Sequence, residues 1–111
     1  MNIALFGRHP SPAEHIVFPE GIPDEKMHDY RWMDEMFTQF FRATPIKMYT
    51  SELDESNKWK RVETCLYVEG YTPALVAFLD KWDRWFGKKE STLYLMHYQP
   101  DGTYRTQVWN P

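Results

Sequence analysis

The chain contains a single cysteine, Cys65, so it cannot form an internal disulfide. A lone cysteine fits a reducing compartment. Long apolar runs are also missing, since no stretch approaches the roughly 18 consecutive apolar residues of a membrane span. The first residues lack the basic leader and the apolar core of a signal peptide. We therefore expect a cytoplasmic protein that has no membrane partner.

Glycine is sparse and scattered, at positions 7, 21, 70, 87 and 102. Phosphate-binding loops need glycines only a few residues apart, so this spacing excludes them. The sequence also has no Gly-x-Ser-x-Gly turn, and no two histidines lie four residues apart around a glutamate, as a zinc-binding helix requires. The sequence therefore predicts no catalytic residue, no metal ion and no cofactor.

Strong net charge is absent as well, because the total is −3. Residues 1–57 carry ten acidic and five basic side chains, whereas residues 58–111 carry six and eight. The second half could form a basic patch, which would consist of Lys58, Lys60, Arg61, Lys88 and Lys89. A dedicated nucleic-acid-binding domain is usually clearly basic, so this distribution gives only weak support for such a function.

Apolar residues at three- and four-residue spacing predict two amphipathic helices. The first covers 23–44 and has Pro23 at its first position, and the second covers 72–86 between Thr72 as N-cap and Gly87. Their buried stripes are predicted to be Met27, Tyr30, Met33, Phe37, Phe40 and Phe41 in the first and Leu75, Phe78, Leu79, Trp82, Trp85 and Phe86 in the second. Asp80, Lys81, Asp83 and Arg84 are expected on the polar side of the second helix, with Asp80 and Arg84 spaced for a surface ion pair.

Short alternating segments predict strands at 2–6, 46–50 and 62–69 and two more within 93–109. Residues 7–23 hold four of the eight prolines and are predicted to form a long loop, with at most an edge strand at 16–18. Alternation in 62–69 suggests an antiparallel sheet with one wet face. We expect one α+β domain, 1–111, with two helices on one face of an antiparallel sheet of four to five strands. Its element order is ferredoxin-like (split βαβ), with an added C-terminal hairpin strand.

The C-terminal hairpin is the most informative local pattern. A two-residue turn at Asp101-Gly102 would pair Tyr98 with Arg105 and Tyr94 with Trp109. It would also pair Gln99 with Tyr104, His97 with Thr106, Leu95 with Val108 and Met96 with Gln107. In this register, Tyr94, Tyr98, Arg105 and Trp109 share one aromatic face.

Tyrosine and tryptophan are enriched at protein interfaces, where they bury large areas. We therefore expect a small non-enzymatic binding protein, acting as an inhibitor, an immunity-type neutraliser, an adaptor or a regulator. Its partner would be another protein, a second copy in a homodimer, or both. The predicted contacts are Tyr94, Tyr98, Arg105 and Trp109, with Trp32 on the first helix as a second contact region.

Two other functions remain open. The same aromatic face would suit single-stranded nucleic acid, with Lys58, Lys60, Arg61 and Arg105 supplying positive charge. A small metal-dependent hydrolase is the other alternative, and it would draw on His9, Glu14, His15 or His97.

Overall fold

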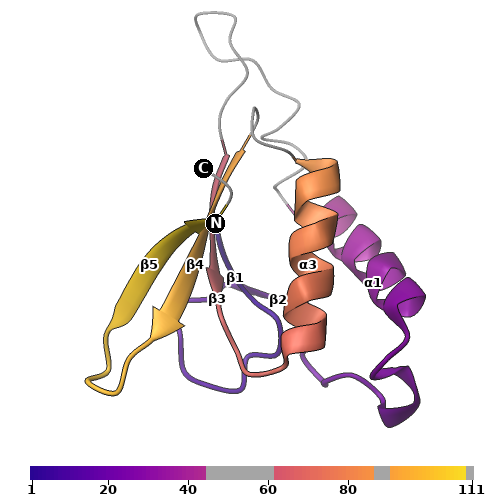
Figure 1. The fold of residues 1–111 in the computed structure, drawn as a ribbon, viewed down its shortest axis with the longest axis horizontal. Helices are drawn as coiled ribbons and strands as arrows, with labels where there is room; N and C mark the ends of the chain where they lie inside the picture. The colour runs from indigo at the N-terminus through magenta and orange to yellow at the C-terminus, as the bar shows by residue number, and fades with distance from the viewer. Residues whose placement is uncertain (45–61, 87–90, 110–111) are drawn as a thin grey trace, which may run out of the picture.

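The computed structural model describes residues 1–44, 62–86 and 91–109. Its elements are β1 (Asn2–Ala4), β2 (His15–Ile16), the 3-10 helix η1 (Asp24–Lys26), α1 (Tyr30–Ala43), β3 (Val62–Tyr67), α3 (Thr72–Trp85), β4 (Ser91–Tyr98) and β5 (Tyr104–Trp109). Within these residues the strands form one sheet in the order β2-β1-β3-β4-β5, and α1 and α3 lie on the same side of it (Figure 1). The predicted α+β class and one-sided helix layer are confirmed. The strand predicted at 46–50 lies outside the described residues.

The sheet is mostly parallel, so the predicted antiparallel, ferredoxin-like sheet is wrong. β1 runs parallel to β2 and β3, β3 runs parallel to β4, and only the β4–β5 pair is antiparallel. The misleading signal was the alternation of β3, where Thr64 and Leu66 are buried while Glu63 is exposed. Parallel strands usually read as continuous apolar runs because helices cover both faces. Here α1 and α3 cover one face, so the strands alternate as antiparallel strands do.

The proline-rich segment, residues 7–23, contacts both the sheet and the core. Its only described strand, β2, pairs with β1 at the sheet edge, which confirms an edge strand but places it at His15–Ile16. The following residues enter the core, where the Phe18 ring lies 5.7 Å from Trp32 and 5.5 Å from Phe37. Residues 15–18 therefore attach the second half of the proline-rich segment to the sheet and the core.

The core fills the space between the sheet and the two helices. The sheet contributes Ile3, Leu66 and Leu93, all fully buried. Phe37 and Phe41 of α1 are also fully buried, and both rings contact Phe78 of α3 at 5.5–5.6 Å in edge-to-face geometry. Such pairs contribute about 0.5–1.5 kcal/mol each beyond the burial of their area. The prediction that Phe37, Phe41 and Phe78 belong to the buried stripes of the two helices is therefore confirmed.

The helix ends differ from the prediction. Asp29 is the N-cap of α1, since its Oδ1 accepts from the Trp32 N–H at 2.9 Å, and Pro23 instead precedes η1. Tyr30, predicted to be buried, sits in the first turn and is 54% exposed. In α3 the N-cap is Tyr71, one residue before the predicted position, and it makes no side-chain capping bond.

Candidate binding face

The hairpin between β4 and β5 has a three-residue loop, so the predicted two-residue turn is wrong by one position. The Gln99 N–H donates to the Thr103 carbonyl at 2.8 Å, and the Gly102 N–H donates to the Gln99 carbonyl at 3.0 Å. Gly102 has a φ of +86°. This pattern matches the common three-residue hairpin loop, in which a type I turn is followed by a left-handed glycine in a bulge.

Two neighbours of Gly102 explain this turn. The ring of Pro100 holds φ near −65°, which suits the first corner of a type I turn. Asp101 then closes the loop, because its Oδ1 accepts from Thr103 Oγ1 at 2.6 Å and from the Thr103 N–H at 3.0 Å. These hydrogen bonds hold the pKa of the Asp101 carboxyl below its usual value. The two-residue turn predicted from the sequence rests on Asp101 and Gly102 alone and leaves Pro100 out.

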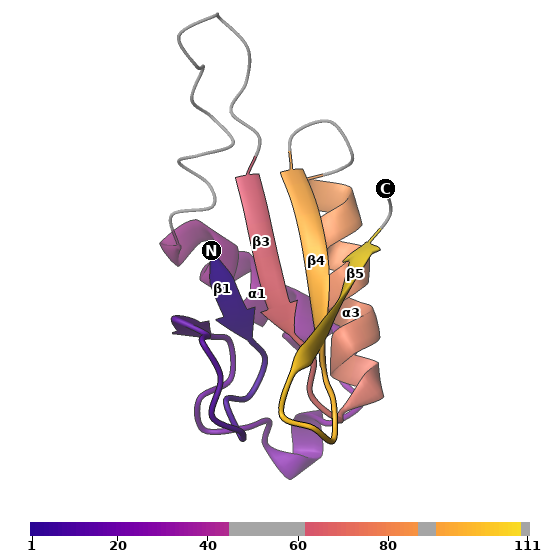
Figure 2. The ribbon, with the colours of Figure 1, turned by 90° about the vertical axis from the view of Figure 1, so that its left-hand side faces the viewer.

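The corrected register moves each β5 side chain to the opposite face from the one predicted. Tyr98 now pairs with Tyr104, and Tyr94 pairs with Val108. On the adjoining strand, Cys65 lies opposite Tyr94. We call the side of the sheet away from the helices the outer face, and its β3, β4 and β5 side chains are Glu63, Cys65, Tyr67, Thr92, Tyr94, Met96, Tyr98, Tyr104, Thr106 and Val108. Figure 2 shows this side, with α1 and α3 behind the sheet.

The predicted contact residues do not share one surface. Tyr94 and Tyr98 lie on the outer face, whereas Trp109 lies opposite the buried Leu93 on the helix side. The Trp109 indole Nε1–H donates to Asp83 Oδ1 of α3 at 3.0 Å.

The other two predicted contacts also lie away from the tyrosines. Arg105 pairs with His97 on the helix-side face, where His97 Nε2 lies 2.8 Å from Gln107 Oε1. Trp32 stacks on Phe18 beside the core. The expectation of one aromatic face that includes Arg105 and Trp109 is therefore wrong, while the binding roles of the five residues stay predictions.

The outer face carries a cluster of three tyrosine rings. The Tyr104 ring centroid lies 5.0 Å from Tyr67 and 5.6 Å from Tyr98, with steep interplanar angles of 85° and 69°. Tyr67 is buried, which raises the pKa of its hydroxyl, while Tyr98 at the rim is 62% exposed. Cys65 is half-buried on the same face, and burial raises the pKa of its thiol. Because thiolate is scarce at a raised pKa, this thiol is poorly reactive at neutral pH.

Glu69 fixes the loop after β1 at one end of this face. Its carboxylate accepts from three consecutive backbone N–H groups, those of Phe6 and Gly7 at 3.0 Å and of Arg8 at 2.8 Å. Gly7 has a φ of +67°, which favours glycine, and a Cβ there would lie 2.5 Å from Ile16 Cδ1, so the Ile16 side chain would have to move. Sequence reasoning missed this clamp because its partners are more than sixty residues apart.

The clamped loop closes the end of the outer face. A hollow of only about 20 Å³ remains there, lined by His9, Ser11, Tyr67, Val68, Glu69, Tyr98 and Tyr104. Tyr104 Oη also donates to the Pro10 carbonyl at 3.4 Å. A space this small holds about one water molecule. The surface available to a large partner therefore runs from Tyr98 towards Val108.

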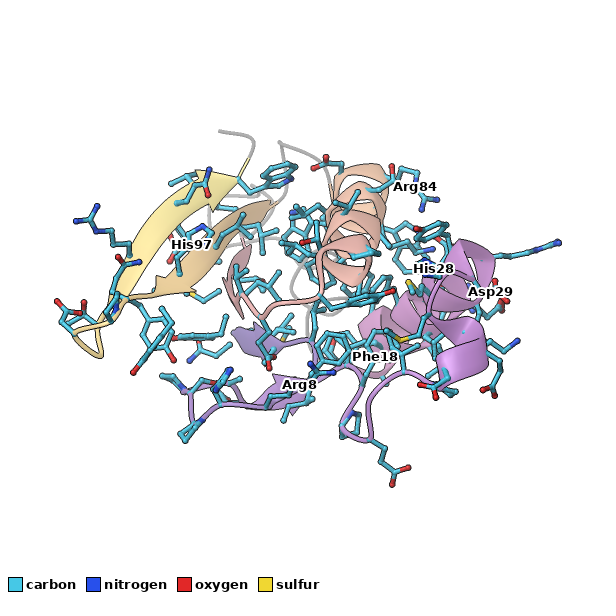
Figure 3. The ribbon with its side chains drawn as sticks, turned by 60° about the horizontal axis from the view of Figure 1, so that its bottom comes forward. Arg8, Phe18, His28, Asp29, Arg84 and His97 are labelled. Atoms are coloured by element: carbon cyan, nitrogen blue, oxygen red, sulfur yellow. The ribbon has the colours of Figure 1, made fainter. Side chains whose placement is uncertain are left out.

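A larger groove lies between α1 and α3 and was not predicted. Its volume is about 810 Å³, and its lining is Tyr30, Arg31, Asp34, Thr72, Pro73, Val76, Ala77, Asp80 and Arg84. Lys81, predicted to face solvent, is only 3% exposed, and its Nζ donates to Asp34 Oδ2 at 3.1 Å. Arg84, labelled in Figure 3, donates to Asp34 and also forms the predicted pair with Asp80. The Arg84 guanidinium, followed by Lys81, holds the pKa of Asp34 below its usual value.

The residues named for the alternative functions are dispersed where the structure describes them. His9 lines the small hollow of the outer face, His15 lies in β2 at the edge of the sheet, and His97 lies in β4, where Figure 3 shows it. Within residues 1–44, 62–86 and 91–109, no three of the His, Cys, Asp and Glu side chains are grouped so that they could hold a metal ion. The basic residues Lys58, Lys60, Arg61, Lys88 and Lys89 lie outside the described ranges.

Comparison with protein-family models, with curated proteins and with solved structures finds no match. Neither α1 nor α3, the two α-helices of the described chain, has the length and apolarity that crossing a membrane requires.

Proposed function

We propose that the protein is a small non-enzymatic binding module whose outer face receives a protein partner. The observation that carries this proposal is the one-sided covering of a mostly parallel sheet. Parallel sheets are ordinarily covered on both faces. In the described chain α1 and α3 cover one face, and Tyr98 and Val108 stay 62% and 42% exposed on the other.

The chemistry of this face favours a protein over other partners. Tyrosine rings bury much area at small entropic cost, and the edge-to-face contacts of Tyr104 with Tyr67 and Tyr98 hold these rings in place before binding. Met96 adds a flexible apolar side chain that adapts to different surfaces. Inhibitors, immunity-type neutralisers, adaptors and regulators all act by covering a partner through such a surface.

Single-stranded nucleic acid is less well supported by the described residues. Glu63 is exposed on the outer face, where its charge repels phosphates, and Arg105 lies on the helix side of β5. Titration of tryptophan fluorescence with oligonucleotides at low salt checks this alternative, because electrostatic binding is strongest there. A salt-dependent fluorescence change on titration would favour it.

A matched pair of charge insertions tests the proposed face. Tyr98→Lys places an ammonium on the outer face, and Val76→Lys places one on α3 at nearly the same exposure, 62% against 59%. Affinity capture from the native cell lysate should yield a protein with the wild type and Val76→Lys that is absent with Tyr98→Lys, while circular dichroism shows both variants folded. Loss of the captured protein with Val76→Lys but not with Tyr98→Lys would refute the outer face as the binding surface.

A further inference from the structure

Among the strands of residues 1–44, 62–86 and 91–109, β5 forms one edge of the sheet. It pairs with β4 without interruption from Leu93↔Trp109 to Tyr98↔Tyr104, and it contains no proline and a single charged residue, Arg105. The opposite edge strand, β2, has only two residues. Proteins commonly limit edge pairing with short strands, prolines, bulges or inward-pointing charges. By this comparison the β2 edge is protected, whereas β5 keeps six residues that can accept another strand.

The hydrogen-bonding pattern shows which groups of β5 are free to pair. The bond from the Gln99 N–H to the Thr103 carbonyl marks a hydrogen-bonded pair. Bonded and non-bonded pairs alternate along an antiparallel ladder. The backbone groups of Arg105, Gln107 and Trp109 therefore point to β4, and those of Tyr104, Thr106 and Val108 point away from it. The side chains of these three residues lie on the outer face, because they are opposite Tyr98, Met96 and Tyr94 of β4.

We propose that β5 pairs antiparallel with β5 of a second copy of this chain, with Thr106 opposite Thr106 at the dyad. In this register Tyr104 faces Val108 of the other copy, and Arg105 faces Gln107. Aromatic with β-branched pairs and threonine pairs both stabilise neighbouring strands. The register pairs five of the six residues of β5, 104–108, with the same residues of the second copy, and it places no charge opposite a like charge.

Neighbouring registers are less favourable. In a symmetric antiparallel pair the residue at the dyad lies opposite its own copy, so each register brings a different residue together with itself. Shifting one way places Arg105 opposite Arg105, and like charges directly opposite each other destabilise a sheet. Shifting the other way places Gln107 opposite itself and Arg105 opposite Trp109, whose indole already bonds Asp83. The sequence of β5 is thus most complementary to itself about Thr106.

This dimer goes beyond the proposed function and does not depend on it. Edge pairing leaves the outer face of each copy open and joins the two faces into one surface. An edge contact of five residues a side falls at the small end of protein interfaces, below about 1,200 Å², where association is weak or transient. We expect dissociation in the micromolar range or weaker.

Sedimentation equilibrium of the full chain, from micromolar to millimolar concentration, tests the pairing with two opposite charge changes. Gln107→Glu should tighten the dimer about fivefold at low salt, since it faces Arg105 in two symmetry-related pairs, and Gln107→Lys should weaken it by a similar factor. In the register with Gln107 opposite itself both variants would weaken the dimer. A monomer at all concentrations, or weakening by both variants, would overturn the proposal.

Two further variants separate the edge from the outer face. Thr106→Pro removes an N–H that points away from β4, so it should abolish dimerisation while the circular-dichroism spectrum is kept. Tyr98→Lys alters the outer face on β4 and should leave the dimer intact, even if it abolishes capture of the protein partner. A dimer that survives Thr106→Pro but is lost with Tyr98→Lys would show that the outer face, and not the β5 edge, joins the two copies.

Discussion

Tyr98 and Tyr104 face each other across the end of the β4–β5 hairpin, with ring centroids 5.6 Å apart and ring planes 69° apart. This contact depends on the three-residue loop, because a two-residue turn would place Tyr104 opposite Gln99. The same register turns Trp109 towards α3. One residue of loop length thus decides which rings are available to a partner and which hold the fold together.

The hairpin loop gives a first prediction. Gly102 has a φ of +86° and Gly70 does not have a positive φ, yet no atom lies within 4 Å of the position that a Cβ would take at either residue. Gly102→Ala should therefore lower the free energy of unfolding by about 1 kcal/mol through backbone strain alone, and Gly70→Ala should not. Urea unfolding measures both, and an equal effect at the two sites would contradict the left-handed assignment of Gly102.

The two faces of the hairpin predict different outcomes for two alanine variants. Trp109→Ala removes a ring that packs on the core and bonds Asp83, so it should lower stability by about 1–3 kcal/mol. Tyr98→Ala removes a mostly exposed ring and should cost less than about 1 kcal/mol, while it weakens partner binding. Thermal unfolding compares the two variants. A larger loss of stability for Tyr98→Ala than for Trp109→Ala would contradict the assignment of Trp109 to the core side and Tyr98 to the outer face.

The Lys81–Asp34 pair predicts a stability difference between two aspartates of one ion network. Asp34→Asn leaves Lys81, 3% exposed, without its carboxylate. Because Asp34 itself is 40% exposed, water partly screens the loss, and we expect about 1–2 kcal/mol. Asp80→Asn, which removes the 68% exposed partner of Arg84, should cost under about 0.5 kcal/mol. Denaturant unfolding at neutral pH compares them, and equal losses would argue against a special role for Lys81.

The same carboxylate predicts a pH dependence. The pKa of Asp34 is lower in the folded protein than its ordinary value of 3.8. The stabilisation is therefore fully present above that ordinary value, and it is lost as the pH falls through the lower folded-state pKa. Unfolding measured as a function of pH should show a smaller acid-dependent loss for Asp34→Asn than for the wild type. Identical acid profiles would contradict the assignment.

The Glu69 clamp predicts a local opening. Glu69→Gln replaces one acceptor oxygen by a donor N–H₂ beside backbone N–H groups, so stability should fall by about 1–3 kcal/mol. Amide hydrogen exchange should accelerate at Phe6, Gly7 and Arg8. Glu63→Gln, an exposed change on the neighbouring strand β3, is the matched control and should leave these amides unaffected. Unchanged exchange in Glu69→Gln would exclude the clamp.

Local signals predicted much of the fold. The apolar period located both helices, although the predicted capping residues misplaced where each one begins, and the alternation of β3 correctly divided Thr64 and Leu66 from Glu63 and Cys65. Strand direction was predicted wrongly because the alternation of apolar and polar residues indicates only how many faces of a sheet are covered. It gives no information on whether neighbouring strands are parallel or antiparallel. A parallel sheet that is covered on one face only therefore has the same pattern as an antiparallel one.

The candidate site was less accessible to sequence reasoning because its geometry depends on contacts between distant residues. The Glu69 clamp joins segments more than sixty residues apart, and the buried Lys81 pairs with Asp34 of the other helix, 47 residues away in the sequence. The hairpin register, by contrast, could have been predicted. Pro100 fits the first corner of a type I turn, and with Gly102 after Asp101 it indicates a three-residue loop.

The reactivity of Cys65 tests the central claim, that the outer face is the binding surface, most directly. This thiol is the only one in the chain, lies on β3 opposite Tyr94, and is half-buried with a raised pKa. Alkylation should be slow at neutral pH and should accelerate as the pH rises through that pKa. Bound partner protein should slow it further, because the partner covers the face, whereas dimerisation through β5 should not. An unchanged alkylation rate in the partner complex would contradict the proposal.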